Sequence, residues 1–377
     1  MSQPEQKLLL ENHPHLRLVF GDGSVAQVGE LARELGATKA LLVTDPGIVV
    51  AGHSARVNGL LESAGIAVTV FDRSKENPTT ACVDECAAMA KDAGIDFIIG
   101  LGGGSSMDTA KGCNFILTNG GEMKDYWGIG KASQPMLPSI MIPTTAGTGS
   151  ECQSFALISD NATHQKMACG DPKAMAQVAI LDPELTLSQP PRVTACTGID
   201  AIAHAVETAV TRKRNETSLK YSRAAFQMML ENFSRVLESP DDLEARGQML
   251  LGAAHSAANP LTAHFDVIHG QAVGMMLPHV VRFNAEEETV AEGYAALVKD
   301  TAVASSNGTL SAEALAQAME ALLDSANLPR ALAQCGVDEA QLETLSKEAV
   351  GQWTASFNPR DITAADFTGL YQKAFAS

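Results

Sequence analysis

The stretch FIIGLGGGSSMDTAKG, residues 97–112, joins an apolar segment to a helical one through a run of glycines. Its first five residues have the length and apolar character of a buried strand, and the residues from Ser105 onward have helical spacing. Glycines let a backbone approach a ligand closely, and the start of a helix offers unpaired N–H groups to an anion. The stretch therefore predicts either a pyrophosphate-binding loop or a tight glycine turn before a serine-capped helix.

Short apolar segments of strand length alternate with helical segments throughout the first half of the chain. The expected strands are KALLVT (39–44), VTVF (68–71), FIIGL (97–101), SIMI (139–142) and VAIL (178–181), and the clearest expected helices span 82–94 and 105–117. This alternation is typical of βαβ units with a mostly parallel sheet. We therefore predict an α/β dinucleotide-binding domain over residues 1–186.

The pattern changes after residue 186. QPPR at 189–192 contains two prolines that disfavour a continuous helix. Long helical periodicities follow, for example over residues 218–238, with few β-branched runs. We predict an all-α domain over residues 187–377.

Composition narrows the class of protein. The chain has 377 residues and a formal charge of -17, which argues against a nucleic-acid binder because such a protein needs a basic surface. The seven cysteines are scattered without a C-x-x-C motif, which disfavours a disulfide framework and a thiolate zinc site. The N-terminus does not resemble a signal peptide, and no apolar run approaches the roughly 20 residues of a membrane helix. We expect a cytoplasmic protein without nucleic-acid or membrane partners.

Polar residues follow two other predicted strands. The segment PTTAGTGSE (143–151) offers Thr144, Thr145 and Thr148, which suit hydrogen bonds to ribose or nicotinamide groups but also suit local turns. Asp45 ends a strand, where a carboxylate binds ribose hydroxyls and repels a 2′-phosphate in dinucleotide-binding folds. It is also well placed to cap a helix that begins at Pro46.

The second predicted domain contains an acidic and histidine-rich region. In GIDAIAHAVE (198–207), an Asp and a His stand four residues apart and so lie on one face of a helix. Buried groups of this kind need each other, a hydrogen-bond network or a metal. Several imidazoles converging on this carboxylate would make a site for Fe(II) or Zn(II), although spacing does not select among them. The candidates are Asp200, His204, His255, His264, His269 and His279.

Four of these stretches, in order and spacing, resemble the iron-containing (group III) alcohol dehydrogenase family. They are GGGSSMDTAKG, PTTAGTGSE, GIDAIAHAVE and LGAAH...VIHG...MLPHVVRFN, and the resemblance covers nearly the whole chain. It implies a dehydroquinate synthase-like architecture and hydride transfer between NAD(H) and a small alcohol, aldehyde or ketone. It also implies that an Asp and three His form the metal and catalytic site, with His264 and His279 in supporting roles, and we expect a homodimer. The matching ligand positions are Asp200, His204, His255 and His269.

The resemblance also implies a set of NAD-binding residues, of which Asn77 and Lys166 are assigned by it alone. One position departs from the family, because many members carry a further His four residues after the third ligand, where this chain has Asn259. That departure leaves the proton route open. The implied cofactor-binding residues are Asp45, Asn77, Gly103, Gly104, Ser105, Asp108, Thr144, Thr145, Thr148 and Lys166.

Three other functions fit parts of the pattern. A glycerol dehydrogenase or a cyclase resembling dehydroquinate synthase would share the architecture, and a non-catalytic sensor of metal and nucleotide would share the sites. Residues 198–209 and 250–281 contain no Arg or Lys, which disfavours a phosphate-bearing substrate and hence the cyclase. The intact ligand and cofactor positions favour an enzyme over a sensor.

Overall fold

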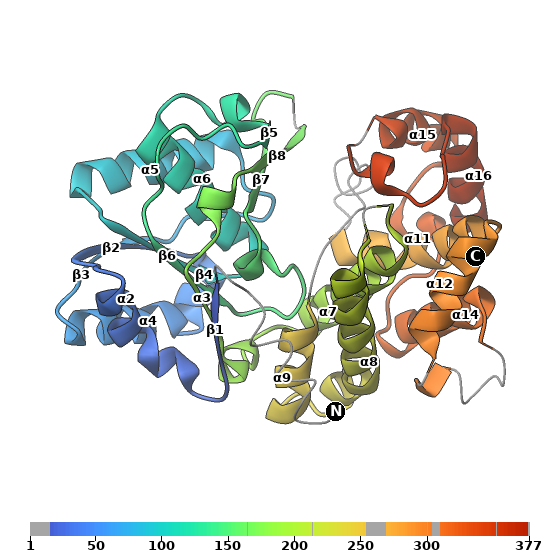
Figure 1. Ribbon diagram of the computed structural model, residues 1–377, viewed down its shortest axis with the longest axis horizontal. Helices are drawn as coiled ribbons and strands as arrows, with labels where there is room; N and C mark the ends of the chain where they lie inside the picture. Colours follow the sequence, from blue (N-terminus) through green and yellow to red (C-terminus); the bar gives the residue numbers. More distant parts are fainter. Residues whose placement is uncertain are drawn as a thin grey trace. The chain divides into compact units, whose positions relative to one another are not determined.

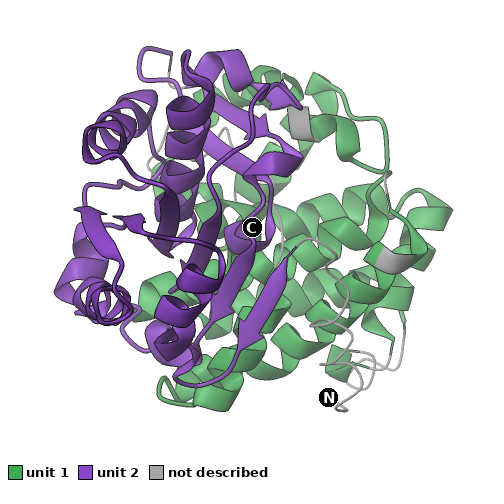
Figure 2. Cartoon of the chain, turned by 60° about the vertical axis from the view of Figure 1, so that its left-hand side comes forward, with its two compact units in different colours: residues 1, 146–148, 190–377 green, residues 2–145, 149–189 purple. Residues whose placement is uncertain are grey.

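The computed structural model (Figure 1) describes residues 16–163, 165–212, 214–253, 269–299, 301–303, 310–351 and 353–375. The chain divides into two compact units, coloured separately in Figure 2. The first, called here the α/β unit, holds the described residues up to Thr145 and those from Gly149 to Gln189. The second, the helical unit, holds Ala146–Thr148 and the described residues from Pro190 onward. A single loop, residues 143–151, therefore contributes to both units.

A six-stranded sheet forms the centre of the α/β unit. Its order is β1-β9-β6-β4-β2-β3, and every neighbouring pair is parallel. The five predicted strands are confirmed, and β1 is an addition at one edge. The strands are β1 (Arg17–Phe20), β2 (Lys39–Val43), β3 (Ala67–Phe71), β4 (Phe97–Gly102), β6 (Ser139–Pro143) and β9 (Val178–Leu181).

Helices cover both faces of this sheet, because alternate strand residues point to opposite sides. Ala40 and Leu42 belong to a core with α2 and α4, whereas Leu41 and Val43 belong to a core with α5 and α6. All six residues of β4 are buried, as expected for a parallel strand covered on both faces. The helices of the unit are α2 (Val28–Glu34), α3 (Pro46–Val50), α4 (His53–Ser63), α5 (Thr80–Ala93) and α6 (Gly104–Asn119).

The order of the strands places a switch point between β2 and β4. The chain continues from β2 to β3 on one side of this point and from β4 to β6 on the other. In open α/β sheets, ligands bind outside the carboxyl ends of the strands at such a point. Asp45 follows β2 and the glycine loop follows β4, so both lie at the expected ligand edge.

A second, three-stranded sheet was not predicted. It has the order β5-β8-β7, with β7 and β8 antiparallel, and consists of β5 (Gly128–Ile129), β7 (Phe155–Ser159) and β8 (Lys166–Gly170). β5 has two residues, too few to give a periodic signal in the sequence.

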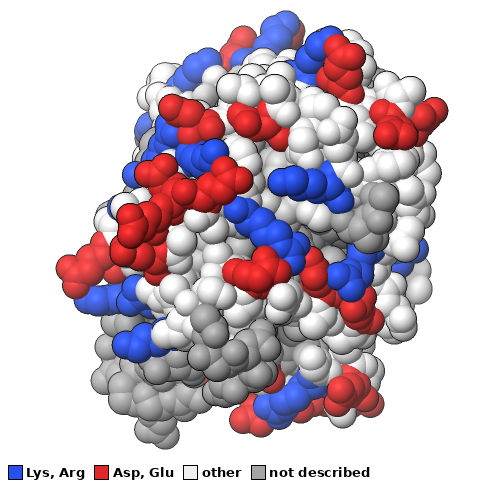
Figure 3. Space-filling model, turned by 90° about the vertical axis from the view of Figure 1, so that its right-hand side faces the viewer, with Lys and Arg blue, Asp and Glu red and all other residues white. Residues whose placement is uncertain are grey.

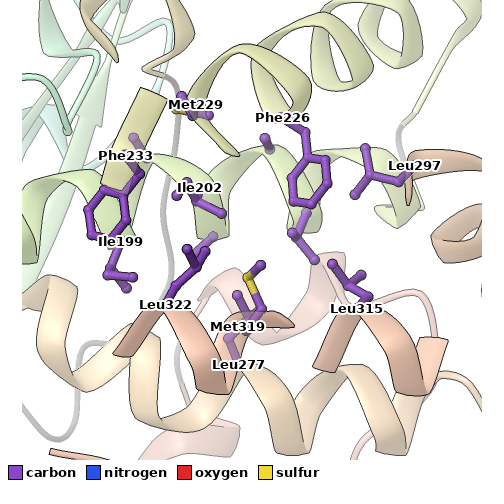
Figure 4. Close-up of a cluster of buried hydrophobic side chains, with 14 of the residues drawn as sticks. Ile199, Ile202, Phe226, Met229, Phe233, Leu277, Leu297, Leu315, Met319 and Leu322 are labelled. Carbon is purple, nitrogen blue, oxygen red and sulfur yellow. The ribbon is translucent and has the colours of Figure 1, made fainter. Parts of the chain in front are cut away.

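The helical unit packs around its first helix, α7. Figure 4 shows Ile199 and Ile202 of α7 facing side chains from neighbouring helices, including Phe233 and Met319. Among the described residues from Pro190 onward there are helices and no strand, in agreement with the predicted all-α character. The α-helices are α7 (Pro191–Val210), α8 (Glu216–Glu238), α9 (Leu243–Gly252), α11 (His269–Asn284), α12 (Glu288–Val298), α14 (Ala312–Ser325), α15 (Leu342–Val350) and α16 (Ala364–Phe375).

The two prolines of QPPR mark the beginning of α7. Pro190 is its N-cap and Pro191 its first residue, a position where the missing N–H costs no helical hydrogen bond.

All seven cysteines are free thiols. None of the helices in the described ranges has both the length and the apolarity that crossing a membrane requires.

On the face drawn in Figure 3, acidic and basic side chains are interspersed among the described residues. In the helical unit, Arg282 forms ion pairs with Glu313 and Glu320. Such pairing of opposite charges is typical of a solvated protein surface.

Candidate functional site

The glycine loop leads directly into α6. Gly103 is the N-cap of the helix in extended conformation, and no side chain caps it, so the predicted serine cap is not formed. Gly102 has a φ of 142°, which favours glycine. A Cβ at Gly102 would lie 2.8 Å from Ser106 Oγ and 3.0 Å from Asp45 Oδ2. An uncapped helix start offers its backbone N–H groups to an anion, and the pyrophosphate-binding loop stays a prediction.

Asp45 has a structural role at the start of α3. Its Oδ1 accepts hydrogen bonds from the N–H groups of Gly47 at 2.9 Å and Ile48 at 3.1 Å, so the helix-capping alternative is realised. Its Oδ2 accepts a hydrogen bond from Ser106 Oγ at 3.0 Å. The carboxylate is thus held beside the glycine loop, where a role in binding ribose remains compatible with capping.

Asn77 and Lys166, which only the family resemblance singled out, contact each other. Lys166 Nζ donates a hydrogen bond of 3.2 Å to Asn77 Oδ1 across 89 positions of sequence. Asn77 has a φ of 51°, a left-handed conformation that Asn tolerates better than most residues. The next residue, Pro78, accepts a hydrogen bond from Ser159 N at 2.8 Å, which ties this turn to the end of β7.

The hydroxyl-rich loop lies beside the glycine loop. The N–H of Thr144 donates to the carbonyl of Gly102 at 3.0 Å. Thr145 Oγ1 is buried without a hydrogen-bond partner among the described residues, and it lies 3.6 Å from the position of a Cβ on Gly103. Thr148 groups instead with the helical unit. A buried hydroxyl without a partner costs free energy, so Thr145 is well suited to bond a ligand.

Asp108 and Lys111 of α6 form a buried polar cluster with Ser150, near the end of the hydroxyl-rich loop, and with β7. These contacts were not predicted from the sequence. Asp108 accepts hydrogen bonds from Ser150 Oγ at 2.6 Å and from Leu157 N at 3.2 Å. Lys111 Nζ donates to the carbonyls of Ser150 at 2.5 Å and Phe155 at 2.9 Å, and lies 3.8 Å from Asp108 Oδ1. Burial raises the pKa of Asp108 and lowers that of Lys111, while each opposes the shift of the other. Asp108, which was predicted to bind the cofactor, therefore makes hydrogen bonds to other residues of the protein.

Glu151 lies next to this cluster. It is 3% exposed, and its Oε2 has no hydrogen-bond partner among the described residues. Burial raises its pKa to about 7, and the nearby charge of Lys111 opposes the shift. Lys111 and Glu151 lie inside the motifs GGGSSMDTAKG and PTTAGTGSE quoted above. An Asp and a Lys three positions apart, in a helix with no other charged residue, were the available signal for this cluster.

Asp200, His204 and His269 meet in the helical unit. Asp200 Oδ1 lies 3.2 Å from His204 Nε2 and 3.8 Å from His269 Nε2. Asp200 and His204, one turn apart on α7, are 4% and 1% exposed, and His269 begins α11. The close approach depends on Gly270, where a Cβ would lie 3.1 Å from the Cβ of Asp200. Three of the four predicted metal ligands are therefore neighbours.

The donor atoms of these three residues suit a divalent cation. Ligand atoms about 2.1 Å from a tetrahedral ion lie roughly 3.4 Å from one another, close to both measured separations. Within the described ranges, however, these three residues by themselves do not form a complete group that could hold a metal ion. His255, the fourth predicted ligand, lies outside the described residues, as do His264 and Asn259. The site is therefore described in part, and its donors fit the expected metal.

Two further side chains shape the surroundings of this site. Glu207, three residues after His204, has its pKa raised well above the usual value, first by burial and second by the charge of Asp200. Arg192 Nη2 donates a hydrogen bond of 3.1 Å to Gln271 Oε1, two residues beyond His269. Residues 198–209 and 250–281 contain no Arg or Lys, yet the hydrogen bond to Gln271 places Arg192 against the second of these ranges. This contact weakens the sequence argument against an anionic substrate.

Comparison with known proteins agrees with this arrangement. The model of the iron-containing alcohol dehydrogenase family matches residues 14–183, and that of the C-terminal part of the Fe-containing alcohol dehydrogenase family matches residues 194–375. The chain is 32% identical over 370 residues to the NAD-dependent methanol dehydrogenase of Bacillus methanolicus, covering 94% of this chain and 97% of that one.

A second relative, the choline dehydrogenase of Bacillus subtilis, is 34% identical over 374 residues, which cover 94% of this chain and 92% of the relative. The solved structure of an alcohol dehydrogenase from Oenococcus oeni superimposes with a TM-score of 0.89 at 27% identity, covering 95% of this chain and 98% of that one. The two family models together match most of the sequence. The chain belongs to the iron-containing alcohol dehydrogenase family.

Proposed function

We propose that this protein is a metal-dependent oxidoreductase that transfers hydride between NAD(H) and a small alcohol, aldehyde or ketone. The observation that carries the proposal is the approach of two imidazoles, His204 and His269, to the buried carboxylate of Asp200. Family membership and the NAD-dependent methanol dehydrogenase among the relatives support the class of reaction.

The metal site consists, in this proposal, of Asp200, His204, His255 and His269. One carboxylate and three imidazoles accept Fe(II), and they accept Zn(II) as well. When bound, such a cation polarises the oxygen of the alcohol or carbonyl, and the nicotinamide carries the hydride. The chain's part is to hold Asp200 and His204 on α7 and His269 on α11, so that the orientation of these three donors is fixed before substrate arrives.

The cofactor site consists of groups at the carboxyl ends of the strands of the α/β unit. The first turn of α6 receives the pyrophosphate, Asp45 receives the adenosine ribose, and the hydroxyl of Thr145 supplies a donor beside the glycine loop. Asn77 and Lys166 add a polar pair at the end of β7. The full proposed set is Asp45, Asn77, Gly103, Gly104, Ser105, Asp108, Thr144, Thr145, Thr148 and Lys166.

The protein acts, in this proposal, as a cytoplasmic homodimer whose chains each have a cofactor domain over residues 1–186 and a metal-binding domain over residues 187–377.

Asn259 occupies the position where many family members have a His. An amide orients a hydroxyl but does not take up its proton, so alcohol oxidation sends its proton elsewhere.

A substrate screen tests the proposal directly. Purified protein is stripped of metal and reconstituted with Fe(II) or Zn(II), and NADH formation or consumption is followed with small alcohols, diols and aldehydes. We expect turnover of at least one alcohol–aldehyde pair that depends on added metal and is lost in His269→Ala. Metal-independent turnover would contradict the proposed mechanism, and metal and NADH binding without turnover of any alcohol would favour the sensor.

A further inference from the structure

We infer that Ser106 is a positioning residue for cofactor choice: its hydroxyl fixes the carboxylate of Asp45 in the orientation that receives a ribose hydroxyl and repels a 2′-phosphate. The inference rests on the proposed function, in which Asp45 faces the adenosine ribose. It adds a residue that neither the sequence motifs nor the expected cofactor set assigns to this task.

The contacts of Asp45 leave its carboxylate little freedom. Oδ1 accepts two backbone N–H groups at the start of α3, and Oδ2 accepts the Ser106 hydroxyl at 3.0 Å. A carboxylate offers about four lone-pair sites, so these three bonds leave about one for a ligand. The orientation of that remaining site depends on Ser106, because the two N–H groups hold only the opposite oxygen.

Ser106 is itself rigid. Its side chain is 1% exposed and lies in the first turn of α6, so it has little freedom to turn away from Asp45. A side chain at Gly102 would collide with both partners of this hydrogen bond, at 2.8 Å from Ser106 Oγ and 3.0 Å from Asp45 Oδ2. Asp45, Gly102 and Ser106 therefore form one compact group at the switch point of the sheet.

This group connects two parts of the proposed cofactor site. Ser106 belongs to the helix whose first turn is proposed to bind the pyrophosphate, and Asp45 follows the neighbouring strand β2. A hydrogen bond from a hydroxyl to a carboxylate is stronger than one between neutral groups. Binding of the pyrophosphate to α6 therefore sets the position of the carboxylate relative to the ribose.

A purely structural role for Ser106 predicts a different result from the positioning role. If Ser106 only stabilised the loop, its loss would weaken NADH and NADPH binding alike. If it orients Asp45, its loss weakens NADH binding and relaxes the exclusion of NADPH, so the ratio of the two dissociation constants falls. The effect must also depend on the presence of the carboxylate.

The test is a double-mutant cycle that measures binding. NADH and NADPH dissociation constants are determined by fluorescence titration for the native protein, Ser106→Ala, Asp45→Gly and the double variant. We expect Ser106→Ala to lower the NADPH/NADH ratio of Kd values about threefold to tenfold, the net effect of one hydrogen bond of ordinary strength. In the Asp45→Gly background the same substitution should leave the ratio unchanged.

Two further variants complete the experiment. Ser63→Ala removes a hydroxyl that donates to the Gly59 carbonyl on an exposed face of α4, away from Asp45, and should leave both Kd values unchanged. Ser106→Cys keeps the side-chain shape with a weak donor and should lower the ratio as Ser106→Ala does. An unchanged ratio in both Ser106 variants, or an equal fall in the Asp45→Gly background, would overturn the inference. A native protein that binds neither nucleotide would instead overturn the proposed function.

Discussion

Gly270 lies against the backbone of Cys196, so closely that a Cβ on Gly270 would stand 2.0 Å from the Cys196 carbonyl oxygen. No side chain fits in that space, and α11 therefore approaches α7 more closely than two helices with larger residues would. The same approach brings His269, the residue before Gly270, to 3.8 Å from Asp200. A packing requirement and the metal site are thus coupled through adjacent residues.

We predict that Gly270→Ala moves α11 away from α7 and impairs the metal site. Overpacking at a buried helix contact costs about 1–3 kcal/mol, and the displaced imidazole no longer completes the ligand set. The expected result is loss of bound metal and a fall in kcat/KM of at least about tenfold. Elemental analysis and steady-state kinetics measure both, and Gly369→Ala in α16, where a Cβ meets nothing within 4 Å, is the matched control. Full metal content in Gly270→Ala would show that His269 is not a ligand or that the helices adjust.

A second prediction concerns His269 itself. His269→Ala should retain the fold, because the side chain is 24% exposed and belongs to no hydrophobic core cluster. The variant should nevertheless lose metal and turnover. Far-ultraviolet circular dichroism checks the fold, and elemental analysis checks the metal. His53→Ala, in the α/β unit, should keep both metal and activity. A metal-free native protein with full activity would contradict the mechanism.

Much of the fold was predictable from the sequence because strong local signals determine it. The five predicted strands are short apolar runs in a buried parallel sheet, and such runs are legible without tertiary information. β7 and β8 were missed because their stability comes from pairing with each other, which a short local run signals weakly.

The site was predictable in type but not in its contacts. The four-residue spacing of Asp200 and His204 indicated a shared face, and the structure places their side chains 3.2 Å apart. By contrast, the Asn77–Lys166 contact spans 89 positions and the Asp45–Ser106 contact spans 61. Sequence spacing carries no information about pairs that only tertiary packing brings together, and the position of Arg192 beside Gln271 was missed for the same reason.

A third prediction separates the two roles of Asp45. Asp45→Asn keeps an oxygen that caps α3, and Asn is about as good an N-cap as Asp, so stability should change little. The substitution removes the negative charge, so the exclusion of a 2′-phosphate should relax and the preference for NAD over NADP should narrow by about tenfold or more. Kinetics with both cofactors is the measurement, and thermal unfolding is the control for the cap. Equal kcat/KM values for NAD and NADP in the native enzyme would show that Asp45 does not face the ribose.

The last prediction concerns pH and the buried Glu151. Its pKa is raised from 4.5 to about 7, chiefly by burial, so the folded protein holds this proton more tightly than the unfolded chain does. The stability that this proton contributes is complete below about pH 4.5 and is lost as pH rises through 7. A difference of this size corresponds to on the order of 3 kcal/mol at most, or roughly 5–10 °C in Tm for a domain of this size.

Glu151→Gln replaces the ionisable side chain with a neutral one. We therefore expect the difference in Tm between the native protein and this variant to change with pH. The Tm of the native protein should fall relative to that of Glu151→Gln between pH 5 and pH 8, because only the native side chain must ionise inside the protein while Lys111 offsets part of the cost. Thermal unfolding is recorded at each pH with a chelator present, so that metal binding contributes nothing. Glu62→Gln, on the exposed face of α4, is the matched control. A constant Tm difference across this pH range would show that Glu151 stays ionised when buried, with Lys111 as a sufficient counter-charge.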